Sequence, residues 1–460
     1  MNTLFAEHAL LPDGWARDVL LAWDHAGALS SVAVNATAPT DAPRANGPLL
    51  PGMPNLHSHA FQRAFAGLSE YRSSSGTSDS ADSFWTWRAL MYRFALDISP
   101  DQLEAIATQL YIEMLRAGYT SVCEFQYLHH APDGQRYADP AEMAMRLLAA
   151  AQRTGIGITL LPVLYQDAGF GGQPARAEQR RYLNSTEALL DIVARIRARG
   201  ARVGVAPHSL RAVGPQALRE LVAGIHAIDA TAPIHLHIAE QQQEVDDCLA
   251  WSGQRPVEWL LANAPVDARW CLVHATHLSA TERSALAASG AVAGLCPTTE
   301  ANLGDGVFDA ANYIASRGAW GIGSDSHASV DAAEELRLLE YTQRLAQQRR
   351  NVLVGDTQRQ VADHLWLGAV AGGAQASGRA IRGLAPGQPA DFVVLDTRGP
   401  LAGLTATRAL ASHVFANQGR SSVRDVFVAG TQRIRDGEHA LQRASCDHFV
   451  AARTALLHDT

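Results

Sequence analysis

Apolar runs with the length of buried strands alternate with helical patterns through the middle of this chain. The runs lie near residues 51–57, 119–125, 156–163, 202–208, 233–239, 270–275, 291–296 and 319–325. Uninterrupted apolar runs are typical of parallel strands that are buried on both faces. Eight strands alternating with helices over about 280 residues match a (β/α)8 barrel, which needs roughly 250 residues. We therefore predict an α/β protein whose barrel spans residues 51–384.

The segments between these runs carry helix start and stop signals. Ser99 and Pro100 precede a segment with apolar residues every three or four positions, and Gly118 follows it. Serine suits the N-cap, proline the first turn and glycine the exit of a helix. Residues 184–187 open a second such segment, which closes at Gly200.

Both ends of the chain show short strand-like runs in place of the strand–helix alternation. These runs lie at residues 19–23, 31–34, 391–396 and 423–430. We predict that residues 1–50 and 385–460 form one small composite β domain, a β-sandwich built from both termini with a helical tail at the C-terminal end.

Two stretches interrupt the barrel pattern. Residues 69–88 begin polar and end aromatic, and residues 165–183 are rich in Gly, Gln and Arg. Both are expected to be surface loops. The first follows the first barrel strand, so it emerges at the active end of the barrel and is a candidate lid, with Trp87 as a packing residue.

Composition and charge narrow the possible partners. The 460 residues are 47% hydrophobic and 18% charged, with a net charge of −8 and a pI near 6.1. An acidic chain is a poor ligand for nucleic acid or an anionic membrane, so neither is expected as a partner. The N-terminus lacks a basic start and an apolar stretch, and no apolar segment is long enough to span a bilayer. A cytoplasmic protein is expected.

The cysteines argue against two kinds of site, and the chain has no lysine. The five cysteines are scattered and lack a C-x-x-C pair, which argues against a disulfide framework or a thiolate zinc site. All 38 residues of the Lys+Arg total are arginine.

Histidines and one aspartate stand at the ends of the predicted strands. His57 and His59 are one residue apart, so in an extended chain both point to the same face. Because barrel strands end on one rim, polar residues at several strand ends predict a site there. The other candidates are His208, His235, His237, His274 and Asp325.

The chain resembles the amidohydrolase superfamily. The matching features are H-x-H after strand one, histidines on strands five and six, and an aspartate on strand eight. The return at residues 383–393 is similar to the entry into that superfamily's small β domain. The resemblance covers essentially the whole chain and implies a metal-dependent hydrolase with the barrel fold.

The absence of lysine and the step from His237 to Glu240 point to the mononuclear deaminase branch. Binuclear members use a strand-four lysine, whereas H-x-x-E is typical of the mononuclear enzymes. The resemblance then implies one Zn2+ per subunit, held by His57, His59, His237 and Asp325. Iron and manganese remain open, because the same donors accept several divalent ions. His235 shares the ligand face of a regular strand and is the rival of His237.

The chemistry of a zinc site assigns three catalytic residues. Zinc lowers the pKa of bound water from 15.7 to roughly 7. Asp325 is expected to accept the water proton, and Glu240 to carry a proton to the substrate nitrogen so that ammonia leaves. His274 is expected to orient the nucleophile or stabilise the tetrahedral intermediate.

A closer resemblance concerns the substrate. Residues 55–67, 84–88, 124–130 and 208–211 are similar to the N-formimino-L-glutamate deiminases of bacterial histidine degradation. That family hydrolyses the formimino C=N bond to N-formyl-L-glutamate and ammonia. Arginine forks match carboxylates, and the resemblance implies that this small dicarboxylate is bound by Gln62, Arg88, Tyr127, His208 and Arg211.

Three alternatives stay open from the sequence. Trp85 and Trp87 are able to stack on a flat ring, which makes a nucleobase or nucleoside deaminase the second hypothesis. A cyclic-amide hydrolase such as imidazolonepropionase is the third, and a non-catalytic zinc-binding barrel the fourth. We also expect a homodimer, although no residue pattern carries that expectation.

Overall fold

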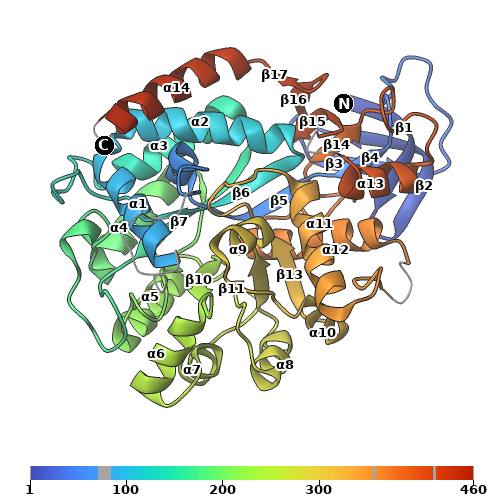
Figure 1. The fold of residues 1–460 in the computed structure, drawn as a ribbon. Coiled ribbons are helices and arrows are strands. Elements are labelled where there is room, and N and C mark those ends of the chain that lie inside the picture. The colour runs from blue at the N-terminus through green and yellow to red at the C-terminus, as the bar shows by residue number, and fades with distance from the viewer. Residues whose placement is uncertain (1, 71–83, 356–358, 418–420, 459–460) are drawn as a thin grey trace.

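The computed structural model describes residues 2–70, 84–355, 359–417 and 421–458. Figure 1 shows a barrel of strands with helices around it, and a second sheet at one side where the blue N-terminal and red C-terminal segments meet. Among the described helices, none combines the length and the apolar character needed to cross a bilayer.

The barrel strands correspond to the eight predicted runs. Their bounds are β5 Met53–Ser58, β6 Tyr119–Gln126, β7 Gly157–Leu164, β8 Arg202–Val203, β9 Ala206–Pro207, β10 Ile234–Ile238, β11 Trp270–His274, β12 Val292–Leu295 and β13 Ala319–Ile322. The fourth run, predicted as one strand, is divided into β8 and β9. Both pieces pair with β7, so they occupy one place in the barrel.

Parallel pairing closes the barrel in register. Strands β5 to β8 pair in order, as do β10 to β13. Bridges from Val205 to Ile234 and from Ser58 to Asp325 join these two groups. The second bridge is a pair of backbone hydrogen bonds, in which Asp325 N–H donates to the His57 carbonyl (3.0 Å) and His59 N–H to the Asp325 carbonyl (3.2 Å). Closure therefore places the last predicted site residue directly beside the first two.

Helices cover the outside of the barrel and the top of the strands (Figure 1). Their bounds are η1 Ala60–Phe65, α1 Phe84–Asp97, α2 Pro100–Arg116, α3 Glu142–Thr154, η2 Ala177–Gln179, α4 Thr186–Ala198, α5 Pro215–Ile228, α6 Gln242–Ser252, α7 Pro256–Asn263, α8 Ala280–Ser289, α9 Pro297–Leu303, α10 Ala310–Ala315, α11 Ala332–Gln347, α12 Val361–Ser377, α13 Ala406–Phe415 and α14 Gln442–His458. The predicted cap of α2 is present: Ser99 accepts the Gln102 N–H, and the Gln102 side chain accepts the Ser99 N–H.

Helix α12 packs unusually close to the barrel. A Cβ built on Gly372 would lie 1.7 Å from the Trp320 carbonyl oxygen, and one on Gly373 would lie 2.8 Å from Pro54 Cβ. Side chains at these positions would push the helix away from β13 and β5. The two glycines let α12 seal the junction at which the barrel closes.

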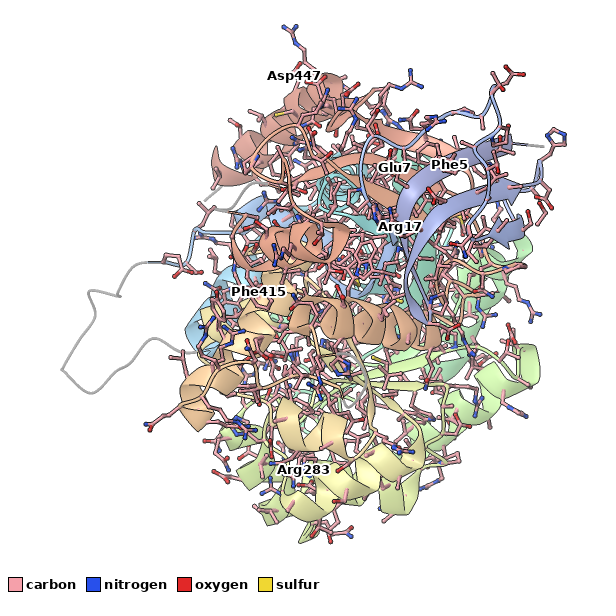
Figure 2. The ribbon with its side chains drawn as sticks, turned by 90° about the vertical axis from the view of Figure 1, so that its right-hand side faces the viewer. Phe5, Glu7, Arg17, Arg283, Phe415 and Asp447 are labelled. Carbon is pink, nitrogen blue, oxygen red and sulfur yellow. The ribbon has the colours of Figure 1, made fainter. Side chains whose placement is uncertain are left out.

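The strands from the two termini form one hydrogen-bonded sheet in the order β17-β16-β15-β14-β4-β1-β2-β3. Their bounds are β1 Asn2–Leu11, β2 Gly14–Trp23, β3 Leu29–Ala33, β4 Leu49–Pro51, β14 Phe392–Leu395, β15 Val423–Val428, β16 Thr431–Arg435 and β17 Glu438–His439. Figure 2 shows Phe5, Glu7 and Arg17 on the β1–β2 hairpin, beside the red strands of the other terminus. The division of the chain at residues 50 and 385 stays a prediction.

This sheet curls around its own core. Trp23 on β2 contacts Phe427 on β15, with ring centroids 6.3 Å apart, although β14, β4 and β1 lie between them in the hydrogen-bonded order. In a flat sheet, strands four places apart would be about 19 Å distant. The two halves therefore face each other, as in the predicted sandwich, across a core that includes Phe392.

The two interrupting stretches differ from the surface loops that were predicted. Residues 71–83 lie outside the described residues, but Arg88 stands on α1 and not at the end of a loop. Apolar residues recur at helical spacing through α1, and this pattern buries Met91 and Phe94 against the core. In the second stretch, Gln179 and Arg181 are buried completely. That segment is therefore part of the interior at its C-terminal end.

Candidate active site

Residues at the carboxyl ends of three barrel strands have a strained backbone conformation. His274, Ala239 and Asp325 have positive φ angles of 66°, 50° and 43°. Residues other than glycine rarely adopt positive φ angles. Such angles persist where the surrounding structure enforces them, often at functional sites. Here it turns the chain sharply after β10, β11 and β13, so that side chains point over the mouth of the barrel.

Four of the predicted ligands converge at that mouth. His57 Nε2 lies 3.1 Å from His59 Nε2 and 2.9 Å from His237 Nε2. Asp325 Oδ1 lies 3.3 Å from the Nε2 atoms of both His57 and His59. One donor atom from each of these residues falls within 4.8 Å of all the others, and all four side chains are buried.

Hydrogen bonds fix the protonation of two of these imidazoles. His59 Nδ1 contacts the Phe125 carbonyl at 3.0 Å, and His237 Nδ1 contacts the His208 carbonyl at 3.1 Å. A carbonyl oxygen only accepts, so each Nδ1 carries a proton. Burial holds the pKa of His237 well below its ordinary value, so its ring is neutral. Its Nε2 therefore presents a bare lone pair toward His57.

This arrangement fits a divalent cation. Burial also lowers the pKa of His57, to about 3. Although burial opposes its ionisation, the neighbouring imidazoles of His57 and His59, each 3.3 Å away, hold the pKa of Asp325 well below the usual range. Neutral imidazoles and a carboxylate are the donors that Zn2+ takes. With bonds of 2.0–2.1 Å, two ligand atoms lie about 3.3–3.4 Å apart at the tetrahedral angle and about 2.9 Å apart at a right angle, and the distances of 2.9–3.3 Å in this cluster fall between these limits.

His235, the rival of His237, points elsewhere. Its Nε2 lies 2.8 Å from the Ala376 carbonyl at the end of α12, below the barrel mouth. Of the two histidines on β10, only His237 belongs to the cluster of donor atoms.

A second layer holds the H-x-H turn in place. Asn55 Nδ2 donates to Ser324 Oγ (2.7 Å), which lies 3.0 Å from His327 Nδ1. His327 Nε2 lies 3.2 Å from Ser58 Oγ, which donates to Glu124 Oε2 (2.6 Å). From Asn55 to Glu124, each group in this series donates a hydrogen bond to the next. The series therefore connects the first, second and eighth strands.

The three predicted catalytic residues lie side by side. Glu240 Oε1 and Asp325 Oδ2 are 3.7 Å and 3.8 Å from His274 Nε2. Burial raises the pKa of Glu240. Burial alone would lower the pKa of His274, but Glu240 and the neighbouring carboxylates raise it to about 10. The group therefore combines a carboxyl that is able to take up a proton with an imidazole that is able to donate one.

A pocket opens over these residues. All five residues predicted to bind substrate line it: Gln62, Arg88, Tyr127, His208 and Arg211. The same pocket exposes His59, His237, Glu240, His274 and Asp325. The structure thus brings the predicted binding residues to the predicted metal and catalytic residues.

Arg211 is a buried cation with unused hydrogen-bond donors. Its side chain is 11% exposed, and Nη2 lies 3.7 Å from Glu244 and 3.9 Å from Glu240. These contacts are too long for hydrogen bonds, and the buried Nε has no partner among the described residues. A buried N–H without an acceptor is costly, so the free Nε–H indicates a site for a ligand that accepts hydrogen bonds.

Sequence reasoning missed several residues of this site. Glu300 Oε1 accepts the Cys296 N–H (2.9 Å) and lies 3.4 Å from His274 Nδ1. Glu300 follows the seventh strand, so the search for polar residues at strand ends would have found it. Tyr92 and Tyr165 also line the pocket. They carried no signal in the sequence, because tyrosine is common in buried positions.

Comparison with known protein families agrees with this geometry. Residues 49–433 match the model of the amidohydrolase family. The chain belongs to the amidohydrolase family. Its N-terminal residues 1–43 match a second model, described as the N-terminal domain of formimidoylglutamate deiminase HutF. The family assignment means that the protein is a metal-dependent hydrolase that acts on C–N bonds.

Relatives within the family include several deaminases. A formimidoylglutamate deiminase of Pseudomonas aeruginosa is 52% identical over 99% of this chain and 100% of its own length. A 5-methylthioadenosine/S-adenosylhomocysteine deaminase of Natronomonas pharaonis is 26% identical over 85% of this chain and 82% of its own length. An 8-oxoguanine deaminase of Pseudomonas aeruginosa is 28% identical over 75% of this chain and 74% of its own.

Solved structures support the fold. An amidohydrolase from Brucella melitensis superimposes with a TM-score of 0.93 at 46% identity, covering 99% of this chain and 100% of its own. An adenosine deaminase from Xanthomonas campestris, solved with bound zinc, gives a TM-score of 0.77 at 22% identity, covering 99% and 98%. The predicted barrel and superfamily are thus confirmed.

Proposed function

We propose that this protein hydrolyses the formimino C=N bond of N-formimino-L-glutamate to N-formyl-L-glutamate and ammonia, with one zinc ion per chain. The substrate is a small dicarboxylate of histidine degradation, which fits a cytoplasmic enzyme. The observation that carries the proposal is Arg211, whose Nε–H has no partner among the described residues and which lines the same pocket as Glu240, His59, His237 and Asp325. The relative of 52% identity, a formimidoylglutamate deiminase, supports the choice of substrate.

The donor cluster is the proposed site of the zinc ion. His57, His59, His237 and Asp325 would hold it, and its distances and fixed tautomers suit the ion. A bound zinc ion supplies Lewis acidity, which makes water a nucleophile near neutral pH.

Three residues carry the protons in this proposal. The ionised Asp325 accepts a proton from the attacking water. Two protons must reach the substrate nitrogen before it leaves as ammonia, and both come from the water that is consumed. Glu240, whose pKa burial raises, takes up these protons and delivers them to the nitrogen. His274, 3.7 Å from Glu240 and 3.8 Å from Asp325, orients the attacking water or stabilises the tetrahedral intermediate, whose oxygen comes from that water.

Carboxylate binding separates this substrate from nucleobases. Arg88 and Arg211 both line the pocket, and arginine forms paired hydrogen bonds with a carboxylate. A nucleobase offers no anionic group to neutralise them. Trp87 also lines the pocket, and its ring packs against Phe65, with the ring centroids 6.0 Å apart. The Trp85 side chain lies outside the described residues.

The deciding experiment measures ammonia release by zinc-loaded protein. N-Formimino-L-glutamate is compared with adenosine, guanine, cytosine and imidazolonepropionate as single substrates. We expect turnover of the first alone. Glu240→Gln should keep the zinc and lose turnover, whereas Glu220→Gln, an exposed control on α5, should change neither. Turnover of a nucleobase, or survival of activity in Glu240→Gln, would overturn the proposal.

A further inference from the structure

Gln179 has a fixed orientation beneath the pocket. It is completely buried, and its Oε1 accepts the Arg176 backbone N–H at 2.8 Å. A backbone N–H only donates, so the oxygen of the amide must face Arg176 and the NH2 group must face the other way. That group donates to the hydroxyl oxygens of Tyr165 (2.6 Å) and Tyr92 (3.0 Å).

Arg88 approaches the same two hydroxyls from the side of α1. Its Nε–H donates to the Tyr92 oxygen at 2.7 Å, and its Nη2 lies 3.5 Å from the Tyr165 oxygen. The guanidinium carbon also lies 5.2 Å from the centre of the Tyr92 ring. Gln179 and Arg88 therefore both direct N–H groups at the pair of phenol oxygens.

Hydrogen-bond accounting then fixes what the two hydroxyls do. A phenol oxygen has two lone pairs and one proton. Both lone pairs of Tyr92 are taken by Gln179 and Arg88, and at least one of Tyr165 is taken by Gln179. Only one lone pair remains for two hydroxyl protons, so at least one proton must be donated outside the pair. Both tyrosines line the pocket, where that proton meets a ligand.

We propose that Tyr92 and Tyr165, oriented by Gln179, form a donor-only subsite that binds a carboxylate of the substrate together with Arg88. This inference rests on the proposed function, because it names the residues that select the dicarboxylate. Gln179 is a positioning residue, since it acts through the tyrosines. A carboxylate accepts hydrogen bonds only, whereas an amide at the same place would turn N–H groups toward other donors.

The test uses glutarate and its monoamide glutaramate as probes, with binding to the zinc-loaded protein measured by calorimetry. The subsite variants are Tyr165→Phe, a double variant that carries both Tyr92→Phe and Tyr165→Phe, and Gln179→Glu. Glutamate at position 179 still accepts the Arg176 N–H, but it also accepts phenol protons and so draws them out of the pocket. Controls are Gln343→Glu and Tyr313→Phe, both buried and outside the pocket lining.

We expect the double tyrosine variant to weaken glutarate binding about tenfold or more, with a smaller effect on glutaramate, because a hydrogen bond to a charged group is lost. Gln179→Glu should weaken glutarate in the wild-type background. In the double variant its effect should shrink, because no phenol protons remain to redirect. If Gln179→Glu weakens glutarate binding equally in both backgrounds, its effect is charge repulsion alone, and the positioning role of Gln179 is wrong.

Two outcomes separate this inference from the proposed function. If the protein releases ammonia from N-formimino-L-glutamate but the tyrosine variants bind glutarate like the wild type, the subsite is wrong and the function stands. If ammonia is not released but glutarate binding depends on the tyrosines, the subsite stands and the function is wrong. Failure of wild-type protein to bind glutarate would overturn the subsite directly.

Discussion

Replacing Arg211 with methionine removes the buried guanidinium and keeps most of its aliphatic stem. A hydrogen bond to a charged group contributes about 1.5–3 kcal/mol. At about 1.4 kcal/mol for each factor of ten, its loss should raise KM by roughly 10- to 150-fold. Because Arg211 lies at the pocket and outside the donor cluster, zinc content should not change.

The same change should also alter the pH dependence of the reaction. Arg211 Nη2 lies 3.9 Å from Glu240 Oε2, where two unit charges interact by about 4 kcal/mol at an effective dielectric constant near 20. Burial raises the pKa of Glu240, and Arg211 opposes that rise. Without the cation the pKa rises further, so the acidic limb of kcat/KM should move to higher pH. A proton acceptor with a higher pKa becomes ionised only at higher pH.

Two companion variants separate the charge from the forked geometry. Arg211→Lys keeps a cation but loses the fork, so KM should rise while the acidic limb stays in place. Arg283→Met removes an arginine on α8 that pairs with Asp309 (2.7 Å) and does not line the pocket; Figure 2 labels it. This control should leave both parameters unchanged. Steady-state kinetics across pH 5–9 give all these quantities, and an unchanged KM in Arg211→Met would refute a carboxylate-binding role.

Three further predictions concern the metal, the second layer and stability. Removal of metal with a chelator should abolish activity, and one equivalent of zinc should restore it; a requirement for two equivalents would contradict one zinc ion at the four-donor cluster found among the described residues. Glu300→Gln should lower kcat by about 10- to 100-fold with little change in KM, because His274 Nδ1 loses its carboxylate; initial rates that match the wild type would exclude this role. His413 is buried without a hydrogen-bond partner among the described residues, and burial lowers its pKa to about 4. Its unfolded pKa of about 6.5 is higher, so the unfolded state binds the extra proton and stability falls as pH drops from about 6.5 to 4. His413→Leu should reduce the slope of the unfolding free energy against pH by about 1.4 kcal/mol per pH unit in that window, as measured by denaturant titration at several pH values. An unchanged slope would contradict the assignment.

The order of elements and the convergence of the candidate metal donors could be predicted from the sequence. Buried parallel strands are continuous apolar runs, and their ends meet on one rim whatever the helices between them do. His57, His59, His237, His274 and Asp325 therefore could be placed near one another without coordinates. The alternation of side chains along a strand also put His57 and His59 on one face.

The tertiary structure decided everything that depends on contacts between distant segments. Strand alternation alone left His235 and His237 equivalent, and the step to Glu240 favoured His237; where His235 points depends on the Ala376 carbonyl, which lies on α12. Arg176, a neighbour in sequence, orients the amide of Gln179, but the role of that amide depends on Tyr92 and Tyr165, which other elements bring to it. Local patterns indicate which face a residue takes, whereas the partners that its side chain meets come from distant segments of the chain.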